Sequence, residues 1–143
     1  LAPDRGAQRV GIVLSNTSGD RLPIYLDLNK RRVVMDRTES GLTDFGQLST
    51  PHERETSDWH TSEGINYKND FALATWASLE LCAGTTYKLR LFFDRSVAEL
   101  FVDEGRIAMT NLVFPHTPYT TLSVFSEGAS TEIKDARLHR LGY

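Results

Sequence analysis

The sequence contains a single cysteine, Cys82, among its 143 residues. One cysteine excludes an internal disulfide bond and a zinc site built from several cysteines. Cys82 follows the apolar stretch "LEL" and precedes Ala-Gly. We therefore predict that it is a small core residue rather than a catalytic nucleophile.

Excess positive charge and long apolar runs are also lacking. The formal net charge is −3, which removes the electrostatic attraction that nucleic acid or an anionic membrane surface would require. No stretch approaches the roughly 20 apolar residues of a membrane-spanning helix. The opening "LAPDRGAQRVG" lacks a positive segment followed by an apolar one, so no signal peptide is predicted. Nucleic acid and membranes are not expected as partners, and no cofactor is predicted.

Short apolar runs separated by turn residues make up most of the chain. Examples are "RVGIVLS", "LPIYLDL", "TYKLRLFF", "VAELFV" and "YTTLSVFS", all of strand length and rich in Val, Leu, Phe, Tyr and Thr. The sequence "DEG" predicts a hairpin turn in which Gly105 has a positive φ. We predict one all-β domain over residues 1–143, a two-sheet antiparallel β-sandwich of the concanavalin or jelly-roll kind with about eight or more strands.

Two segments of this pattern carry specific expectations. "FALATWASLEL" suits a strand or a short helix, and Trp76 within it is expected in the core rather than on a sugar-binding surface. The terminal stretch "TEIKDARLHRL" is expected to form the last strand.

Residues 48–70 form a long polar stretch that interrupts the strand pattern. Such a connection is usually a functional or a mobile loop. It contains side chains of metal-ligand type in His52, Glu53, Glu55 and His60. Their spacing matches no recognised metal site, so no metal is predicted.

Two other interpretations of this loop stay open. Trp59 and Tyr67 are candidate carbohydrate contacts, because their rings could stack on the face of a sugar. Alternatively, the loop is a solvated crossover between the sheets, with Trp59 anchoring it to the core.

The stretch "DRSVAELFVDEGRIAMTNLVFP" places Glu99 in an otherwise apolar strand. Alternation puts Val97, Glu99 and Phe101 on one face and a fully apolar set on the other. A lone carboxylate on a partly buried face requires a partner. Arg90 and Arg95, on the preceding segment, are predicted to supply one by a cross-strand ion pair.

Paired carboxylates are also what the hydrolysis of a glycosidic bond requires, at a separation of roughly 5–5.5 Å in retaining enzymes. Asp94, Asp103 and Glu104 all fall in predicted turns, where neighbouring side chains diverge and water keeps them ionised. No catalytic residue is predicted from this stretch.

Three segments resemble a known family. "LRLFFDRSVAELFVDEGRIAMTNLVFP" (residues 89–115) is similar to the C-terminal module of glycoside hydrolase family 32, the invertases, inulinases and levanases. "IYLDLNKRRVVMDRTESGLTDF" (residues 24–45) and "EIKDARLHRL" (residues 132–141) resemble other strands of the same module. The long polar loop is not covered.

The resemblance implies that catalysis belongs to a different domain. In that family a five-bladed β-propeller precedes the sandwich and carries three acidic motifs, of types Asn-Asp-Pro-Asn, Arg-Asp-Pro and Glu-Cys. This chain has "NDF", "DRT", "DRS" and "ELC" instead, so no catalytic residue is carried over. The resemblance implies the C-terminal part of an enzyme acting on fructans or sucrose, inactive by itself, whose opening strand is missing.

Such a sandwich is expected to stabilise the propeller of the same polypeptide and to contact the fructan or sucrose substrate. If the parent degrades polysaccharides, a secreted or periplasmic location is favoured. Two alternatives stay open: a free-standing carbohydrate-binding sandwich, and a structural or oligomerisation domain. An exposed docking face would favour a homo-oligomer.

Overall fold

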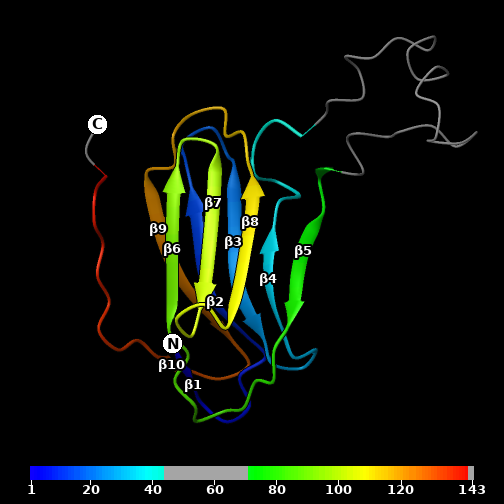
Figure 1. The fold of residues 1–143 in the computed structure, drawn as a ribbon, viewed down its shortest axis with the longest axis vertical. Coiled ribbons are helices and arrows are strands. Elements are labelled where there is room, and N and C mark those ends of the chain that lie inside the picture. The colour runs from blue at the N-terminus through cyan, green and yellow to red at the C-terminus, as the bar shows by residue number, and fades with distance from the viewer. Residues whose placement is uncertain (44–70, 142–143) are drawn as a thin grey trace, which may run out of the picture.

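The structure is a computed structural model that describes residues 1–43 and 71–141. Its strands are all paired antiparallel (Figure 1). In chain order they are β1 (Ala2–Pro3), β2 (Arg9–Ser15), β3 (Arg21–Asp27), β4 (Arg32–Asp36), β5 (Ala74–Ser78), β6 (Leu89–Asp94), β7 (Val97–Val102), β8 (Ile107–Leu112), β9 (Thr121–Glu127) and β10 (Thr131–Glu132).

Two sheets form the layers of the molecule. The five-stranded sheet has the order β5-β4-β3-β2-β9, and the three-stranded sheet has the order β6-β7-β8. Figure 1 shows the three-stranded sheet lying in front of the larger one. The predicted antiparallel β-sandwich is therefore confirmed, with a short third pair, β1-β10, in addition.

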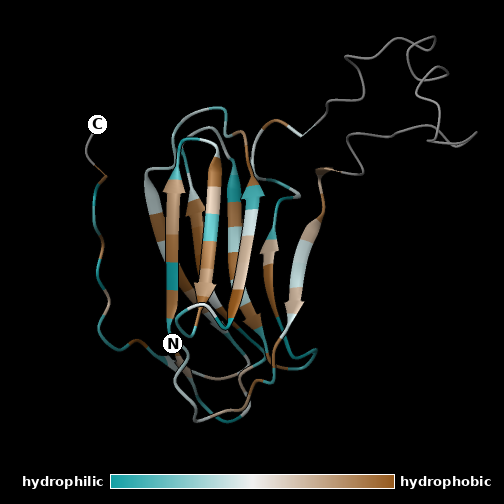
Figure 2. Ribbon diagram, viewed as in Figure 1, coloured by the Kyte–Doolittle hydropathy of each residue, from teal (hydrophilic) through white to brown (hydrophobic). Residues whose placement is uncertain are grey.

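The core lies between the two sheets and follows from alternation along the strands. In β3, Leu22, Ile24 and Leu26 are fully buried, and in β7, Leu100 is 1% exposed. The burial pattern of β7 alternates strictly between buried and half-buried residues, as the sequence predicted for the strand that carries Glu99. Figure 2 shows the resulting apolar bands on the strands of both layers. Burying this apolar surface is the main stabilising contribution to the fold.

Two turns fix the register of the three-stranded sheet. Between β6 and β7 the connection has only two residues, and Arg95 there has a φ of 50°. Between β7 and β8, Asp103, Glu104 and Gly105 have φ values of 48°, 60° and 97°. The predicted turn at Gly105 is confirmed. Because the connections are this short, they determine which residues lie opposite each other.

Two burial predictions were wrong. Trp76 lies on edge strand β5, opposite Val34 on the outer face of the five-stranded sheet, and is 54% exposed. The guanidinium carbon of Arg32 lies 5.1 Å from the centroid of its ring, and such a stacked cation partly shields an exposed indole. Cys82 is also exposed, because it follows β5 in a connecting segment rather than in a strand.

The last segment differs from its prediction as well. Only Thr131–Glu132 form a strand, which pairs with β1. The residues after it extend along the molecule outside both sheets, and Leu138 is 86% exposed. Within the described residues, no strand lies beside this tail.

Replacing the central core leucine tests this packing. We expect Leu100→Ala to lower the free energy of unfolding by about 2–5 kcal/mol, because it removes buried methyl groups and leaves a cavity. Leu112→Ala is the matched control: this residue lies on the same sheet but is 51% exposed, so a change of about 0.5 kcal/mol or less is expected. Urea denaturation measures both, and equal losses would contradict the described core.

Candidate functional site

Glu99 lies on the outer face of the three-stranded sheet, half-buried between Phe92 on β6 and Thr110 on β8. Arg90 lies opposite Phe101, one step along from Glu99, so the two charged residues are diagonal neighbours. The predicted ion pair between Glu99 and Arg90 is not formed in the described parts of the chain. The two-residue turn is the reason, because it sets an aromatic residue rather than an arginine opposite Glu99.

The two acids of the next turn bind the start of β6. The backbone N–H of Lys88 donates to Asp103 Oδ1 at 2.9 Å, and Lys88 Nζ donates to Glu104 Oε1 at 2.9 Å. The hydrogen bond from Lys88 and its positive charge hold the pKa of Glu104 below its usual range. Glu104 therefore stays ionised near neutral pH and is a poor candidate for a proton-donating acid.

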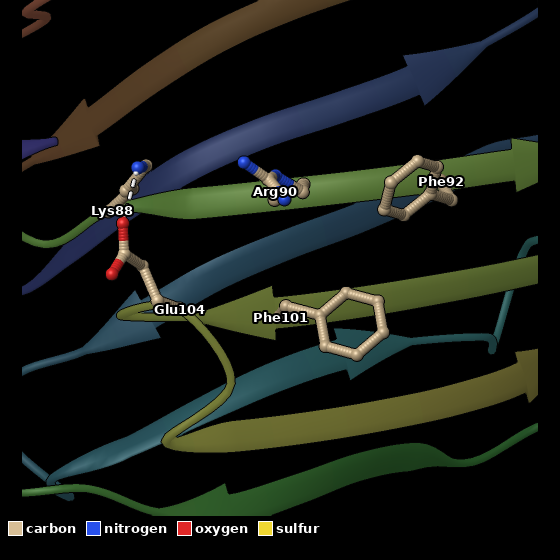
Figure 3. Close-up of a pocket in the computed structure, with 5 residues that line it drawn as sticks. All are labelled: Lys88, Arg90, Phe92, Phe101 and Glu104. Atoms are coloured by element: carbon tan, nitrogen blue, oxygen red, sulfur yellow. Dashed lines mark hydrogen bonds and ion pairs between the residues drawn. The ribbon is translucent and has the colours of Figure 1, made fainter.

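A shallow hollow of about 290 Å³ opens on the same outer face (Figure 3). We call it the β6–β7 hollow, and it is lined by Lys88, Arg90, Phe92, Phe101 and Glu104. Three of these come from alternate positions of β6 and its start, which is why they share one face. The turn after β7 brings Glu104 to the rim, where it meets Lys88.

Two phenylalanines form the apolar part of the hollow. The ring centroids of Phe92 and Phe101 are 6.0 Å apart at an interplanar angle of 82°, an edge-to-face contact. Phe92 is 44% exposed, so one of the two rings presents substantial apolar surface to solvent. This side chain can stack on the C–H groups of a sugar.

The polar rim combines donors with an acceptor. Arg90 and Lys88 supply N–H groups, and Glu104 supplies carboxylate oxygens. A neutral, hydroxyl-rich molecule can form hydrogen bonds with both kinds of group, whereas an anion would be repelled by the carboxylate of Glu104. Glu104 is the single carboxylate of the hollow, so the paired acids of a glycosidase site are not assembled there.

A second polar cluster lies between the β2–β3 turn and the segment before β9. Asp20 is 6% exposed, and its Oδ1 lies 2.9 Å from His116 Nδ1. Asp20 Oδ2 accepts hydrogen bonds from the backbone N–H of His116 at 2.7 Å and from Asn16 Nδ2 at 2.8 Å. Burial of Asp20 opposes ionisation, but these hydrogen bonds outweigh it and hold its pKa below the usual value. The cluster connects two loops, and none of its residues lines the β6–β7 hollow.

Sequence reasoning missed both of these groupings. It placed Phe101 on the outer face with Glu99, but Phe92 joins it only once the hairpin register is known. Asp20 and His116 are 96 positions apart, and no local pattern connects them. The one usable signal was alternation along "LRLFFD", which puts Arg90 and Phe92 on one face.

Several predicted site residues lie outside the described residues. These are the candidate carbohydrate contacts Trp59 and Tyr67, and the ligand-type side chains His52, Glu53, Glu55 and His60. Residues 1–43 and 71–141 contain no group of three or more histidine, cysteine, aspartate or glutamate side chains placed to hold a metal ion. In the same ranges, no helix has the length and apolar character needed to cross a membrane.

Comparisons with known proteins agree with this architecture. The family described as "Glycosyl hydrolases family 32 C terminal" matches residues 2–140. A levanase from Bacillus sp. (strain L7) is 26% identical over 142 residues, which cover 99% of this chain and 13% of the levanase. The crystal structure of exo-inulinase from Aspergillus awamori is similar with a TM-score of 0.63 and 24% identity, over 88% of this chain and 20% of that one. The chain thus spans a small part of each relative's length.

The cluster around Asp20 makes stability depend on pH. A carboxylate whose folded pKa is depressed stabilises the fold above its unfolded pKa of about 3.9, and this stabilisation is lost as pH falls through the folded value. We expect Asp20→Asn to lower the free energy of unfolding by about 1–3 kcal/mol at pH 7. The difference from the unmodified chain should narrow below about pH 4.

Urea denaturation at pH 7, 5, 4 and 3 measures this dependence. The exposed Asp4 provides the control, and Asp4→Asn should change stability at pH 7 by about 0.5 kcal/mol or less. A difference for Asp20→Asn that stays constant from pH 7 to pH 3 would show that the charge of Asp20 is not what stabilises the loops.

Proposed function

The chain belongs to the glycosyl hydrolase family 32 C-terminal domains, and on that premise we propose that it is the non-catalytic sandwich module of an enzyme acting on fructans or sucrose. The observation that carries the proposal is the family match over residues 2–140. The printed names of the two relatives, a levanase and an exo-inulinase, support fructans as the substrate class.

The arrangement of acids supports a non-catalytic role. Glu99 stands on an open sheet face, and Asp103 and Glu104 bind the backbone and side chain of Lys88. A retaining glycosidase requires two carboxyl groups across a sheltered cleft, one of them protonated. Glu104 has no second carboxyl group across the β6–β7 hollow. Lys88 also holds it ionised, so it meets neither condition. Bond cleavage is therefore assigned to another domain of the same polypeptide, a catalytic β-propeller.

Stabilising that catalytic domain is the proposed task of the module. The levanase and the exo-inulinase continue far beyond the matched part, so such a module has a large neighbour within its own chain. The outer faces of the sandwich carry exposed apolar side chains, among them Trp76 and Leu112. Surfaces of this kind are buried at domain interfaces.

A second function, direct carbohydrate binding, is favoured by the β6–β7 hollow. Its exposed Phe92 and its mixed donors and acceptor match the usual composition of small-ligand sites, which are apolar with a few placed polar groups. Fructan contact by the module is proposed at this hollow, and the contacts expected at Trp59 and Tyr67, which lie outside the described residues, stay a prediction.

Absence of hydrolysis is the direct test of the non-catalytic role. We expect the purified chain to release no fructose from sucrose, inulin or levan, because its described acids do not form a catalytic pair. A fructan hydrolase assayed in parallel shows that the assay works. Fructose release by the chain that Glu99→Gln abolishes would contradict the proposal.

Binding by the hollow is tested with a substitution on its exposed ring. We expect Phe92→Ala to weaken binding of a fructo-oligosaccharide by about three- to tenfold, the effect of losing one aromatic contact. Isothermal titration calorimetry measures the affinity. Trp76→Ala, on the opposite layer, is the control and should leave it unchanged. If Trp76→Ala weakens binding and Phe92→Ala does not, the hollow is the wrong site.

A further inference from the structure

The β6–β7 hollow has an aromatic end and a charged end. Lys88, Arg90 and Phe92 occupy alternate positions along β6, with Lys88 directly before the strand. Alternate residues of a strand are about 7 Å apart, so roughly 13 Å separates Lys88 from Phe92. Figure 3 shows Arg90 between Phe92 and the contact of Lys88 with Glu104. A ligand that stacks on Phe92 and continues along β6 therefore meets these charged groups.

The fold does not require a glutamate at position 104. The backbone there has a φ of 60°, in the left-handed region that favours glycine, asparagine and aspartate. The Glu104 side chain is 75% exposed and meets Lys88 in an ion pair whose other member is 56% exposed. Ion pairs as exposed as this contribute little to stability. The remaining consequence of the Glu104 carboxylate is the charge that it gives to the hollow.

The charge of the hollow depends on this one side chain. Lys88 and Arg90 bring two positive charges, and Glu104 brings the single negative charge among the lining residues. Lys88 Nζ lies 2.9 Å from Glu104 Oε1, so their charges compensate each other. The hydrogen bond and charge of Lys88, and then the charge of Arg90, lower the pKa of Glu104. The field of Glu104 therefore reaches Arg90 as well as Lys88.

Arg90 is available to a ligand. Among the ion pairs of the described residues, none includes Arg90, and its position on the outer face leaves it exposed. A free guanidinium beside a lysine is a favourable site for a carboxylate or sulfate group. Without Glu104, the hollow would therefore combine an exposed aromatic ring with two uncompensated cations and would favour anionic ligands.

We propose that Glu104 is the specificity-determining residue of the β6–β7 hollow, which makes the hollow select neutral saccharides over saccharides that carry a carboxylate or sulfate group. This inference rests on the proposed function, in which the hollow binds carbohydrate. The carboxylate accepts hydrogen bonds from sugar hydroxyls and repels an anionic substituent that would otherwise bind Arg90 and Lys88. Repulsion of the wrong ligand by a like charge is a general source of specificity.

This selection agrees with the proposed substrate class. Fructans and sucrose carry many hydroxyl groups and no ionised group, so they lose nothing by lying near a carboxylate. Acidic polysaccharides carry an anionic group on many of their sugar units and would meet Glu104 wherever they stack on Phe92. The hollow would thus exclude them while its aromatic ring and donors stay unchanged.

The test compares a short fructo-oligosaccharide with the same oligosaccharide carrying one sulfate group. Isothermal titration calorimetry measures both affinities for the unmodified chain and for Glu104→Gln, which keeps the size and an acceptor oxygen but removes the charge. Glu127→Gln is the matched control. It removes the same charge from another exposed ion pair, in which Glu127 Oε2 lies 4.0 Å from Arg9 Nε on the larger sheet.

We expect the unmodified chain to bind the neutral probe more tightly than the sulfated one. In Glu104→Gln, the affinity for the sulfated probe should rise about fivefold, the scale of one interaction between exposed charges, while the affinity for the neutral probe changes by less than about twofold. Raising the salt concentration from about 0.02 to about 0.5 M should remove most of this gain, because it screens exposed charges. Glu127→Gln should leave the ratio of the two affinities unchanged.

Three results would overturn the proposal. One is a ratio of affinities that is the same in Glu104→Gln as in the unmodified chain, and another is an equal shift of the ratio in Glu127→Gln. The third is tighter binding of the sulfated probe by the unmodified chain, which would make the hollow an anion site.

Failure of this selection is distinguishable from failure of the proposed function. If Phe92→Ala weakens binding of the neutral probe but Glu104→Gln leaves the ratio unchanged, the hollow binds carbohydrate and Glu104 does not select it. If the unmodified chain binds neither probe, carbohydrate binding at the hollow is wrong and the selection is wrong with it. Fructose release by the chain would contradict the non-catalytic role alone.

Discussion

The apolar contact between the two sheets is the constraint on which the rest of the structure depends. Each sheet has one face that is unfavourable in water, and burial of β7 against β3 and its neighbours satisfies both. Strict alternation along each strand then determines which residues point outward. Glu99, Phe92 and Phe101 share the outer face because Leu100 must occupy the inner one. The aromatic and polar side chains of the β6–β7 hollow that come from these strands are placed by that requirement.

The same constraint explains where the smaller sheet is incomplete. A sheet of three strands cannot cover one of five, so part of the inner face of β9 is left partly exposed at Leu122 and Val124. On the smaller sheet, the backbone of Leu1 exchanges two hydrogen bonds with Tyr87, next to the start of β6.

The sequence predicted features that depend on short-range patterns. Alternation in "VAELFV" gave the two faces of β7, and "DEG" gave the turn at Gly105. It could not predict features that depend on the neighbour of a strand. Trp76 is exposed because β5 is an edge strand, and Glu99 forms no ion pair with Arg90 because a two-residue turn places Phe92 opposite it. Likewise, the tail after β10 is no strand because a strand requires a partner, which local sequence does not specify.

The central proposal is that the acids of the described residues hold the fold together rather than break glycosidic bonds. Glu104 tests it most directly, because it is the one carboxylate among the residues that line the β6–β7 hollow. An NMR titration of its side-chain carboxyl carbon gives the pKa. The account predicts a pKa below the ordinary value for glutamate, caused by the hydrogen bond and charge of Lys88. A pKa raised toward neutrality, as acid catalysis requires, would contradict it.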